Sequence, residues 1–199
     1  FSTGFSMNPA KLAQQMDGET VLWMKEMAKL FNAVLIGSLI IHENLNYFNR
    51  LLVVFPDGQI KYYDKKHLFA MAGENSAYSS GSEKLIFDYK GWRICPLICY
   101  DLRFPVWIRN RNDYDVLIFV ANWPEKRNNH WKILLQARAI ENQAYVVGVN
   151  RIGEDGNQYV YSGDSCVIDP MGNKISSTEA YKENVETVKL SFQELINTR

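Results

Sequence analysis

The sequence predicts one α/β domain with a mixed β-sheet, and three observations lead to this fold class. Apolar segments rich in Val, Ile and Leu alternate with segments of helical periodicity, as in layered α/β proteins. Several short apolar segments are joined by sequences typical of hairpin turns. No stretch rich in Pro, Gly or Ser divides the 199 residues, so we expect a single domain over 1–199.

The first third of the chain predicts helices followed by strands. A helix is expected where a capping residue or a proline precedes apolar residues at helical spacing. A strand is expected where the apolar run is short and unbroken, and Pro-Asp-Gly between two such runs indicates a tight reversal. In chain order the expected elements are a helix starting at Asn8–Pro9, a helix from 17 to about 31, a strand at 33–41, and a hairpin of 51–55 and 59–63.

The rest of the chain predicts a larger set of strands around one long helix. The expected elements are strands at 84–88, 92–98, 116–121 and 144–150, a helix at about 129–142, and short strands at 159–161, 165–169, 174–177 and 185–190. Ser191 and Glu194 have the spacing of a capping box, but Arg199 follows before a helix is expected to develop. We expect that both ends of the domain lie beyond the printed sequence.

Composition and charge favour small-molecule chemistry. Lys and Arg number 22 and are balanced by 22 Asp and Glu, so there is no basic field to bind nucleic acid or an anionic membrane. The apolar runs are far shorter than the roughly 20 residues that span a bilayer. Three cysteines in a chain of this size favour a reducing cytoplasm over a disulfide framework.

Cys99 is the first candidate for a chemical role. An apolar segment, 92–98, ends abruptly at this cysteine, and polar and charged residues follow. N–H groups at the start of the next turn can stabilise a thiolate and lower the thiol pKa below its usual value of about 8.5. The alternative is a buried thiol that packs at the end of a strand. Cys95 and Cys166 are expected to be core residues, and we expect no metal site or cofactor.

Three other segments contain charged residues that could contribute to a site. Lys65 and Lys66 follow the predicted hairpin; they are either ordinary surface lysines or a cation that stabilises a thiolate and an oxyanion. Glu74 is the one carboxylate in a loop of small residues. Arg138 and Glu141 are three residues apart on the predicted long helix, and the plain interpretation is an exposed ion pair of little energetic weight.

Taken in order, these segments resemble the nitrilase superfamily of carbon–nitrogen hydrolases. The resemblance lies in residues 64–69 (DKKHLF), 98–105 (ICYDLRFP), 120–124 (VANWP) and 137–142 (ARAIEN), and it covers nearly the whole chain. It implies that Cys99 is the nucleophile, Lys65 the catalytic lysine, and Glu74 a second catalytic carboxylate that positions Lys65. It also implies a four-layer αββα sandwich with mixed sheets, which commonly pairs as a homodimer or larger homo-oligomer.

Within the superfamily, the chain is most similar to the omega-amidase branch. The similar segments are 71–74 (MAGE), 103–107 (RFPVW) and 120–124. Members of that branch hydrolyse the terminal amide of 2-oxoglutaramate or 2-oxosuccinamate and release ammonia. A backbone N–H near Tyr100 is expected to bind the oxyanion. The oxo-acid carboxylate should need a cationic or N–H-rich partner; the candidates are Arg103 or the loop amides around Asn122 and Trp123, although Arg103 could equally form a structural ion pair.

Other activities remain open at this point. The chain could be another amidase of the superfamily, an N-carbamoyl hydrolase, an acyltransferase that passes the acyl group to an amine, or a non-catalytic ligand-binding member. The family also needs a general-base glutamate in a Pro-Glu-Met-Phe type segment, and residues 1–5 (FSTGF) resemble those just after it. We therefore expect this glutamate immediately before Phe1 in the natural protein; a non-acidic residue there would indicate an inactive member.

Overall fold

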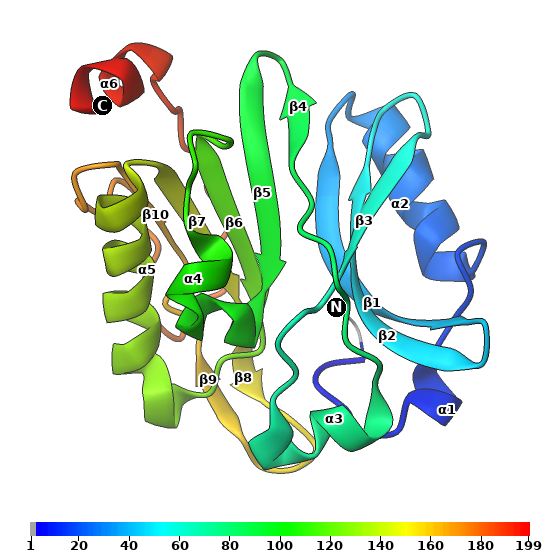
Figure 1. The fold of residues 1–199 in the computed structure, drawn as a ribbon. Coiled ribbons are helices and arrows are strands. Elements are labelled where there is room, and N and C mark those ends of the chain that lie inside the picture. The colour runs from blue at the N-terminus through cyan, green and yellow to red at the C-terminus, as the bar shows by residue number, and fades with distance from the viewer. Residues whose placement is uncertain (1–2) are drawn as a thin grey trace. The chain divides into compact units, whose positions relative to one another are not determined.

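The computed structural model describes residues 3–199. The chain forms two compact units, the first up to Leu85 and the second from Ile86 to Arg199, and each unit contains its own β-sheet (Figure 1). Within residues 3–199, no helix has both the length and the apolar character needed to cross a lipid bilayer. The α/β class predicted from the sequence is confirmed in both units.

The first unit is a three-stranded antiparallel sheet with a helix packed on it. The strand order is β1-β2-β3, and Figure 1 shows α2 lying along one face of this sheet. Apolar side chains at helical spacing on α2 meet alternate side chains of β1 and β2, which gives a buried core. The elements of this unit are α1 (Pro9–Leu12), α2 (Glu19–Leu30), β1 (Leu35–Glu43), β2 (Asn46–Val54), β3 (Ile60–Asp64), η1 (Ala70–Ala72) and α3 (Glu74–Ala77).

A hairpin between β1 and β2, which the sequence did not predict, precedes the predicted one, because β2 begins at Asn46 and not at the expected residue 51. The strands pair from Leu35 with Val54 to Glu43 with Asn46. The two turn residues, Asn44 and Leu45, both have positive φ values, 48° and 65°. Leucine rarely adopts this conformation, so the turn has none of the Asn-Gly or Asp-Gly character by which such hairpins are recognised.

The second unit contains a mixed five-stranded sheet in the order β10-β7-β6-β5-β4. The three central strands are parallel, and each edge strand pairs antiparallel with its neighbour. Helix α5 packs on β7, where a Cβ atom at Gly148 would lie only 2.5 Å from a methyl group of Leu135. The sheet strands are β4 (Phe87–Tyr89), β5 (Trp92–Ile98), β6 (Val116–Ala121), β7 (Tyr145–Asn150) and β10 (Cys166–Ile168).

Helices and a small hairpin complete this unit. They are η2 (Cys99–Arg103), α4 (Pro105–Ile108), η3 (Glu125–Arg127), α5 (Asn128–Asn142), α6 (Phe192–Thr198), and the hairpin of β8 (Ile152–Glu154) and β9 (Val160–Ser162). The predicted strands at 174–177 and 185–190 are wrong, because neither segment forms a strand; Lys174 makes an isolated bridge to Ile168. The expectation that no helix follows Ser191 is also wrong: its side chain accepts the Glu194 N–H and begins α6.

A buried arginine holds the ends of the strands together in the first unit. Arg50 in β2 is 1% exposed and pairs with Asp64, its partner across β3, through two hydrogen bonds of 2.7 and 2.9 Å. A third contact of 3.0 Å reaches Glu43 in β1, and the hydrogen bond from Arg50 holds the pKa of the Glu43 carboxyl below its usual value. Arg50 therefore fixes Asp64, the residue directly before Lys65.

Replacing this arginine should lower stability, and the loss should depend on pH. In an Arg50→Met protein Asp64 and Glu43 lose their partner, which is expected to cost about 3 kcal/mol of unfolding free energy at pH 7. Because the folded-state pKa of Glu43 is depressed, its contribution is complete above about pH 4.3 and is lost as the pH falls through the folded value. Urea unfolding at pH 7 and pH 3 measures both effects. If the unmodified and Arg50→Met proteins differ by the same unfolding free energy at both pH values, the pairing of Glu43 with Arg50 does not contribute to stability.

Candidate active site

Lys65 and Glu74 form a buried ion pair in the first unit. Lys65 Nζ lies 2.6 Å from Glu74 Oε2, and the two side chains are 2% and 0% exposed. A buried ammonium and carboxylate are stable together only when hydrogen bonds also satisfy their remaining donors and acceptors. The pair directs one ammonium group in a fixed orientation, as a site that stabilises a developing negative charge requires.

The backbone around Lys65 is held from both sides. Its N–H donates to Asn49 O at 2.9 Å, and its C=O accepts the Gly81 N–H at 3.0 Å. The chain can approach this closely only because residue 81 is glycine: a Cβ atom there would lie 2.1 Å from Asp64 O. The ladder of β2 and β3 is thus continued by one residue, and Lys65 is as rigid as a strand residue.

Glu74 is anchored by neutral donors as well as by the lysine. Its Oε2 accepts the Phe69 N–H at 2.6 Å, and its Oε1 accepts the amide of Asn49 at 3.0 Å. Nearby, burial raises the pKa of Tyr78 to about 12, and the negative charge of Glu74 contributes in the same direction. Asn49 thus holds both members of the ion pair, by its carbonyl and by its side chain. Asn49 was not among the predicted site residues, because one asparagine in a strand gives no distinguishing signal.

Cys99 lies at the junction between β5 and η2 in the second unit. It is the residue directly after the parallel strand, it is half-buried, and its φ value is +44°. A residue other than glycine in this left-handed region is strained by about 1–2 kcal/mol. Strain of this kind persists when the surrounding structure enforces it, and a sharp strand-to-helix turn directs a nucleophile outward in the α/β-hydrolase fold.

Hydrogen bonding and packing around this turn restrain it. The buried carboxylate of Asp101 accepts the Ile98 N–H at 3.1 Å, which ties the last strand residue to the helical turn. The rings of Tyr100 and Phe104 pack edge to face with their centroids 5.3 Å apart. The segment around Tyr100, where a backbone N–H is predicted to bind the oxyanion, is therefore well packed directly after the cysteine.

Two of the predicted substrate-binding residues contact each other. The guanidinium carbon of Arg103 lies 5.2 Å from the ring centroid of Trp123, and Arg103 Nη2 is 2.8 Å from His130 Nδ1. The cation is half-buried, with an aromatic face on one side and an imidazole on another. His130 was not among the predicted site residues, because this exposed residue at the start of α5 has no distinctive spacing to the motifs.

The loop after β6 is held by Asn150, a further residue that the sequence analysis missed. This buried amide accepts the Trp123 N–H at 2.7 Å and donates to Trp123 O and Gly163 O at 3.0 and 2.8 Å. Asn122, the remaining predicted binding residue, is half-buried in the same loop. A polar residue at the end of an otherwise apolar strand was the available signal, because such a residue must find partners.

The structure thus groups the predicted residues within each unit. Lys65 and Glu74 are together in the first, and Arg103 and Trp123 are in contact in the second, which also contains Cys99. The convergence of Lys65 and Cys99 at one carbonyl group stays a prediction. Among residues 3–199, no three His, Cys, Asp or Glu side chains gather in a way that could hold a metal ion.

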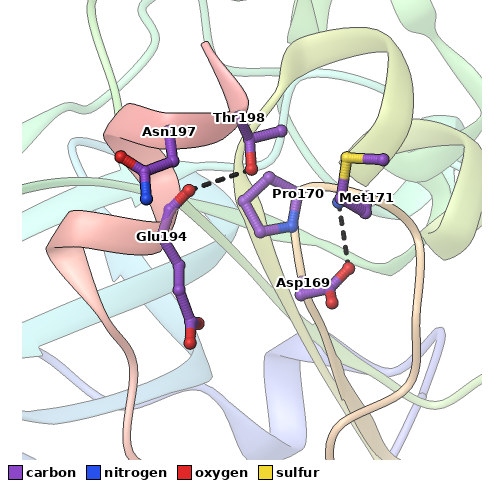
Figure 2. A pocket seen from close by; sticks show the side chains of 6 residues that line it. All are labelled: Asp169, Pro170, Met171, Glu194, Asn197 and Thr198. Atoms are coloured by element: carbon purple, nitrogen blue, oxygen red, sulfur yellow. Dashed lines mark hydrogen bonds between the residues drawn. The ribbon is translucent and has the colours of Figure 1, made fainter.

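A shallow pocket of about 350 Å³ lies elsewhere in the second unit. Figure 2 shows that side chains of α6 face the turn after β10 across it. Phe192 of α6 packs on Trp92, the first residue of β5, whereas Cys99 follows the last residue of that strand. The pocket is therefore at the other end of β5 from the thiol. It is lined by Asp169, Pro170, Met171, Glu194, Asn197 and Thr198.

Comparison with known proteins relates this arrangement to one family. The carbon-nitrogen hydrolase family model matches residues 1–199. Omega-amidase YafV of Escherichia coli K12 is 48% identical over 195 residues, which are 98% of this chain and 76% of that protein. The 2-oxoglutaramate amidase of Bacillus subtilis is 35% identical over 204 aligned residues, covering all of this chain and 78% of that protein.

A solved structure gives the same result for the fold. It is that of a CN-hydrolase superfamily protein from Xanthomonas campestris with an arsenic adduct in its active site. The TM-score is 0.94 at 46% sequence identity, and the match covers 98% of this chain and 76% of that one. The likeness confirms the α/β fold of the nitrilase type that the sequence predicted.

The strain at Cys99 can be measured by comparing two replacements that both remove the thiol. Glycine adopts a positive φ without cost, so Cys99→Gly should be more stable than Cys99→Ala by about 1 kcal/mol. At Cys95, in the regular part of β5, the order should be reversed, with the glycine variant less stable by about 0.5–1 kcal/mol. Urea denaturation of the four variants makes the comparison. If the alanine variant is the more stable of the two at position 99 as well as at position 95, the turn is not strained.

Proposed function

Because the chain belongs to the carbon-nitrogen hydrolase family, we propose that it is an omega-amidase that releases ammonia from the terminal amide of a short 2-oxo acid such as 2-oxoglutaramate. The curated relatives described above support the substrate class, since one is named an omega-amidase and another a 2-oxoglutaramate amidase. The observation that carries the chemistry is the position of Cys99, a thiol at a strained turn directly after a central strand.

In the proposed first half-reaction, the Cys99 thiolate adds to the amide carbonyl. The carbonyl π electrons move to oxygen, and Lys65 with the N–H near Tyr100 stabilises that oxyanion. Glu74 keeps the ammonium of Lys65 oriented through the 2.6 Å ion pair. When the oxyanion collapses, the carbon–nitrogen bond breaks, the nitrogen accepts a proton and leaves as ammonia, and a thioester remains on Cys99.

In the second half-reaction, water replaces the thiol. A general base removes a proton from water, the resulting hydroxide adds to the thioester carbonyl, and the carbon–sulfur bond breaks to release the 2-oxo dicarboxylate and the thiolate. The base that we propose is the glutamate expected immediately before Phe1. The same carboxylate is expected to supply the proton to ammonia in the first half-reaction, so that it ends the cycle in its starting state.

Recognition of the substrate's carboxylate is assigned to Arg103. Its guanidinium contacts Trp123 and His130 on two sides, and these contacts hold it in one orientation. A planar guanidinium that is already restrained loses little conformational entropy when it binds a carboxylate. Asn122 and Trp123 are proposed to form the adjoining wall of the substrate site, in the loop that Asn150 anchors.

Assembly and location form part of the same proposal. Val106 in α4 and Ile140 in α5 are 90% and 52% exposed, and exposed apolar side chains of this kind support pairing of two copies as a homodimer. A cytoplasmic location is supported by cysteine use: the three thiols form no disulfide within the described chain. Burial raises the pKa of Cys166 to about 11, so that this thiol stays protonated.

Removing the thiol tests the mechanism directly. In the full-length protein, Cys99→Ala should lower kcat for 2-oxoglutaramate at least about 1,000-fold, because no thioester can form. Cys95→Ala, four residues earlier and within β5, is the matched control and should retain its activity. The measurements are ammonia release and detection of the acyl-enzyme by mass spectrometry. A Cys99→Ala protein that still turns over 2-oxoglutaramate would refute the mechanism.

The same assay distinguishes the other activities of the family. Ammonia release is compared among oxo-acid amides, simple nitriles and N-carbamoyl compounds, and products are analysed with an added amine nucleophile. Preference for a nitrile or an N-carbamoyl compound, or transfer of the acyl group to the amine, would overturn the omega-amidase assignment.

The role of Arg103 is tested by a change in substrate discrimination. Arg103→Gln should raise the KM for 2-oxoglutaramate roughly tenfold, since a charged hydrogen bond contributes about 1.5 kcal/mol or more. The KM for butyramide, a neutral amide, should stay within about twofold of its original value, because butyramide has no carboxylate that Arg103 could bind. Steady-state kinetics on both substrates decides the matter, and an equal rise for both would show that Arg103 is structural.

A further inference from the structure

Arg138 of α5 lies behind the turn that contains Cys99. The residue is 4% exposed, and two of its N–H groups, on Nε and Nη2, donate to Leu102 O at 3.1 and 2.7 Å. Leu102 belongs to η2, three residues after the proposed nucleophile. We infer that Arg138 is a positioning residue, which holds η2 in place and thereby fixes the direction of the Cys99 thiol. The inference rests on the proposed function, because it requires Cys99 to be the nucleophile.

The carbonyl that Arg138 binds is one that needs an external donor. The last carbonyl groups of a helix have no intrahelical N–H partner, and in a five-residue 3₁₀ turn this applies to most of them. At the other end of the turn, the buried Asp101 carboxylate accepts the Ile98 N–H. A buried carboxylate thus restrains the entry to the turn and a buried guanidinium restrains its exit.

Strain at Cys99 explains why both restraints are needed. A residue at φ +44° returns to an extended or right-handed backbone unless its neighbours prevent it. Loss of the Leu102 contact would allow the turn to relax and the thiol to move. A displacement of about 1 Å at a reacting group can lower a rate by as much as about 100-fold, without a matching loss of substrate binding.

The contact with Glu141 has a different role. Arg138 Nη1 lies 2.8 Å from Glu141 Oε1, and the Glu141 side chain is 34% exposed. The sequence analysis interpreted this pair as an exposed ion pair of little weight. The structure corrects that interpretation for Arg138, whose guanidinium is buried against Leu102 O. Glu141 neutralises the charge of Arg138 from the solvent side. An uncharged hydrogen-bond acceptor at position 141 should therefore preserve the two hydrogen bonds from Arg138 to Leu102 O.

The test compares Arg138 variants with variants of Arg93, an arginine of the same unit in β5. Arg93, near the start of β5, also donates two side-chain hydrogen bonds to a single buried partner, Asp115. In the full-length enzyme, Arg138→Met should lower kcat for 2-oxoglutaramate about tenfold or more with KM within about twofold. Arg138→Lys, which can donate to Leu102 O at one point, should recover part of kcat. Arg93→Met should lower the melting temperature and leave kcat unchanged.

A readout that does not involve the substrate separates this inference from the proposed function. Alkylation of Cys99 by iodoacetamide at fixed pH should be at least threefold slower in Arg138→Met and unaltered in Arg93→Met. If the unmodified enzyme fails to hydrolyse 2-oxoglutaramate, the proposed function fails, and the alkylation rates still test Arg138. Glu141→Gln should keep kcat near that of the unmodified enzyme. The inference is overturned if Glu141→Gln loses as much kcat as Arg138→Met, or if Arg138→Met and Arg93→Met have equal kcat and alkylation rates.

Discussion

The left-handed backbone at Cys99 is the constraint on which the candidate site depends. A parallel strand must end sharply for a side chain to leave the sheet at its carboxyl edge, and an L-residue at such a turn is strained. The rest of the second unit offsets that strain. The central position of β5, the Asp101 carboxylate on Ile98 and the Arg138 guanidinium on Leu102 each make relaxation of the turn unfavourable.

In the first unit, neighbouring groups compensate for buried charges, as they compensate for backbone strain in the second. A buried ammonium would be costly alone, and it is stable because Glu74 faces it at 2.6 Å and Asn49 and Phe69 satisfy the carboxylate. Arg50 of β2 is likewise buried and pairs with Asp64. Two ion pairs therefore fix the consecutive residues Asp64 and Lys65 at the end of β3. Rigid elements with satisfied polar groups are what a precise site requires.

The family relationship and the geometry answer different questions. Similarity over 98% of the chain to an omega-amidase and to a solved CN-hydrolase structure identifies the family and the fold. Fold alone does not select a substrate, because sites with different specificity occur on one scaffold. The choice of a 2-oxo acid amide therefore depends on particular side chains, and those that we propose for it are the cation of Arg103 and the loop that contains Trp123.

The sequence alone determined the α/β class, the strands at 92–98 and 116–121, and the motifs around Cys99 and Lys65, because these features are local in the chain. Only the tertiary structure decided the roles of Asn49, Asn150 and Arg138. Each is a polar residue with a buried partner far away in the sequence, 36 residues away for Arg138 and Leu102. Local patterns indicate which residues face a core, whereas the partner of a buried polar group is set by which elements pack together.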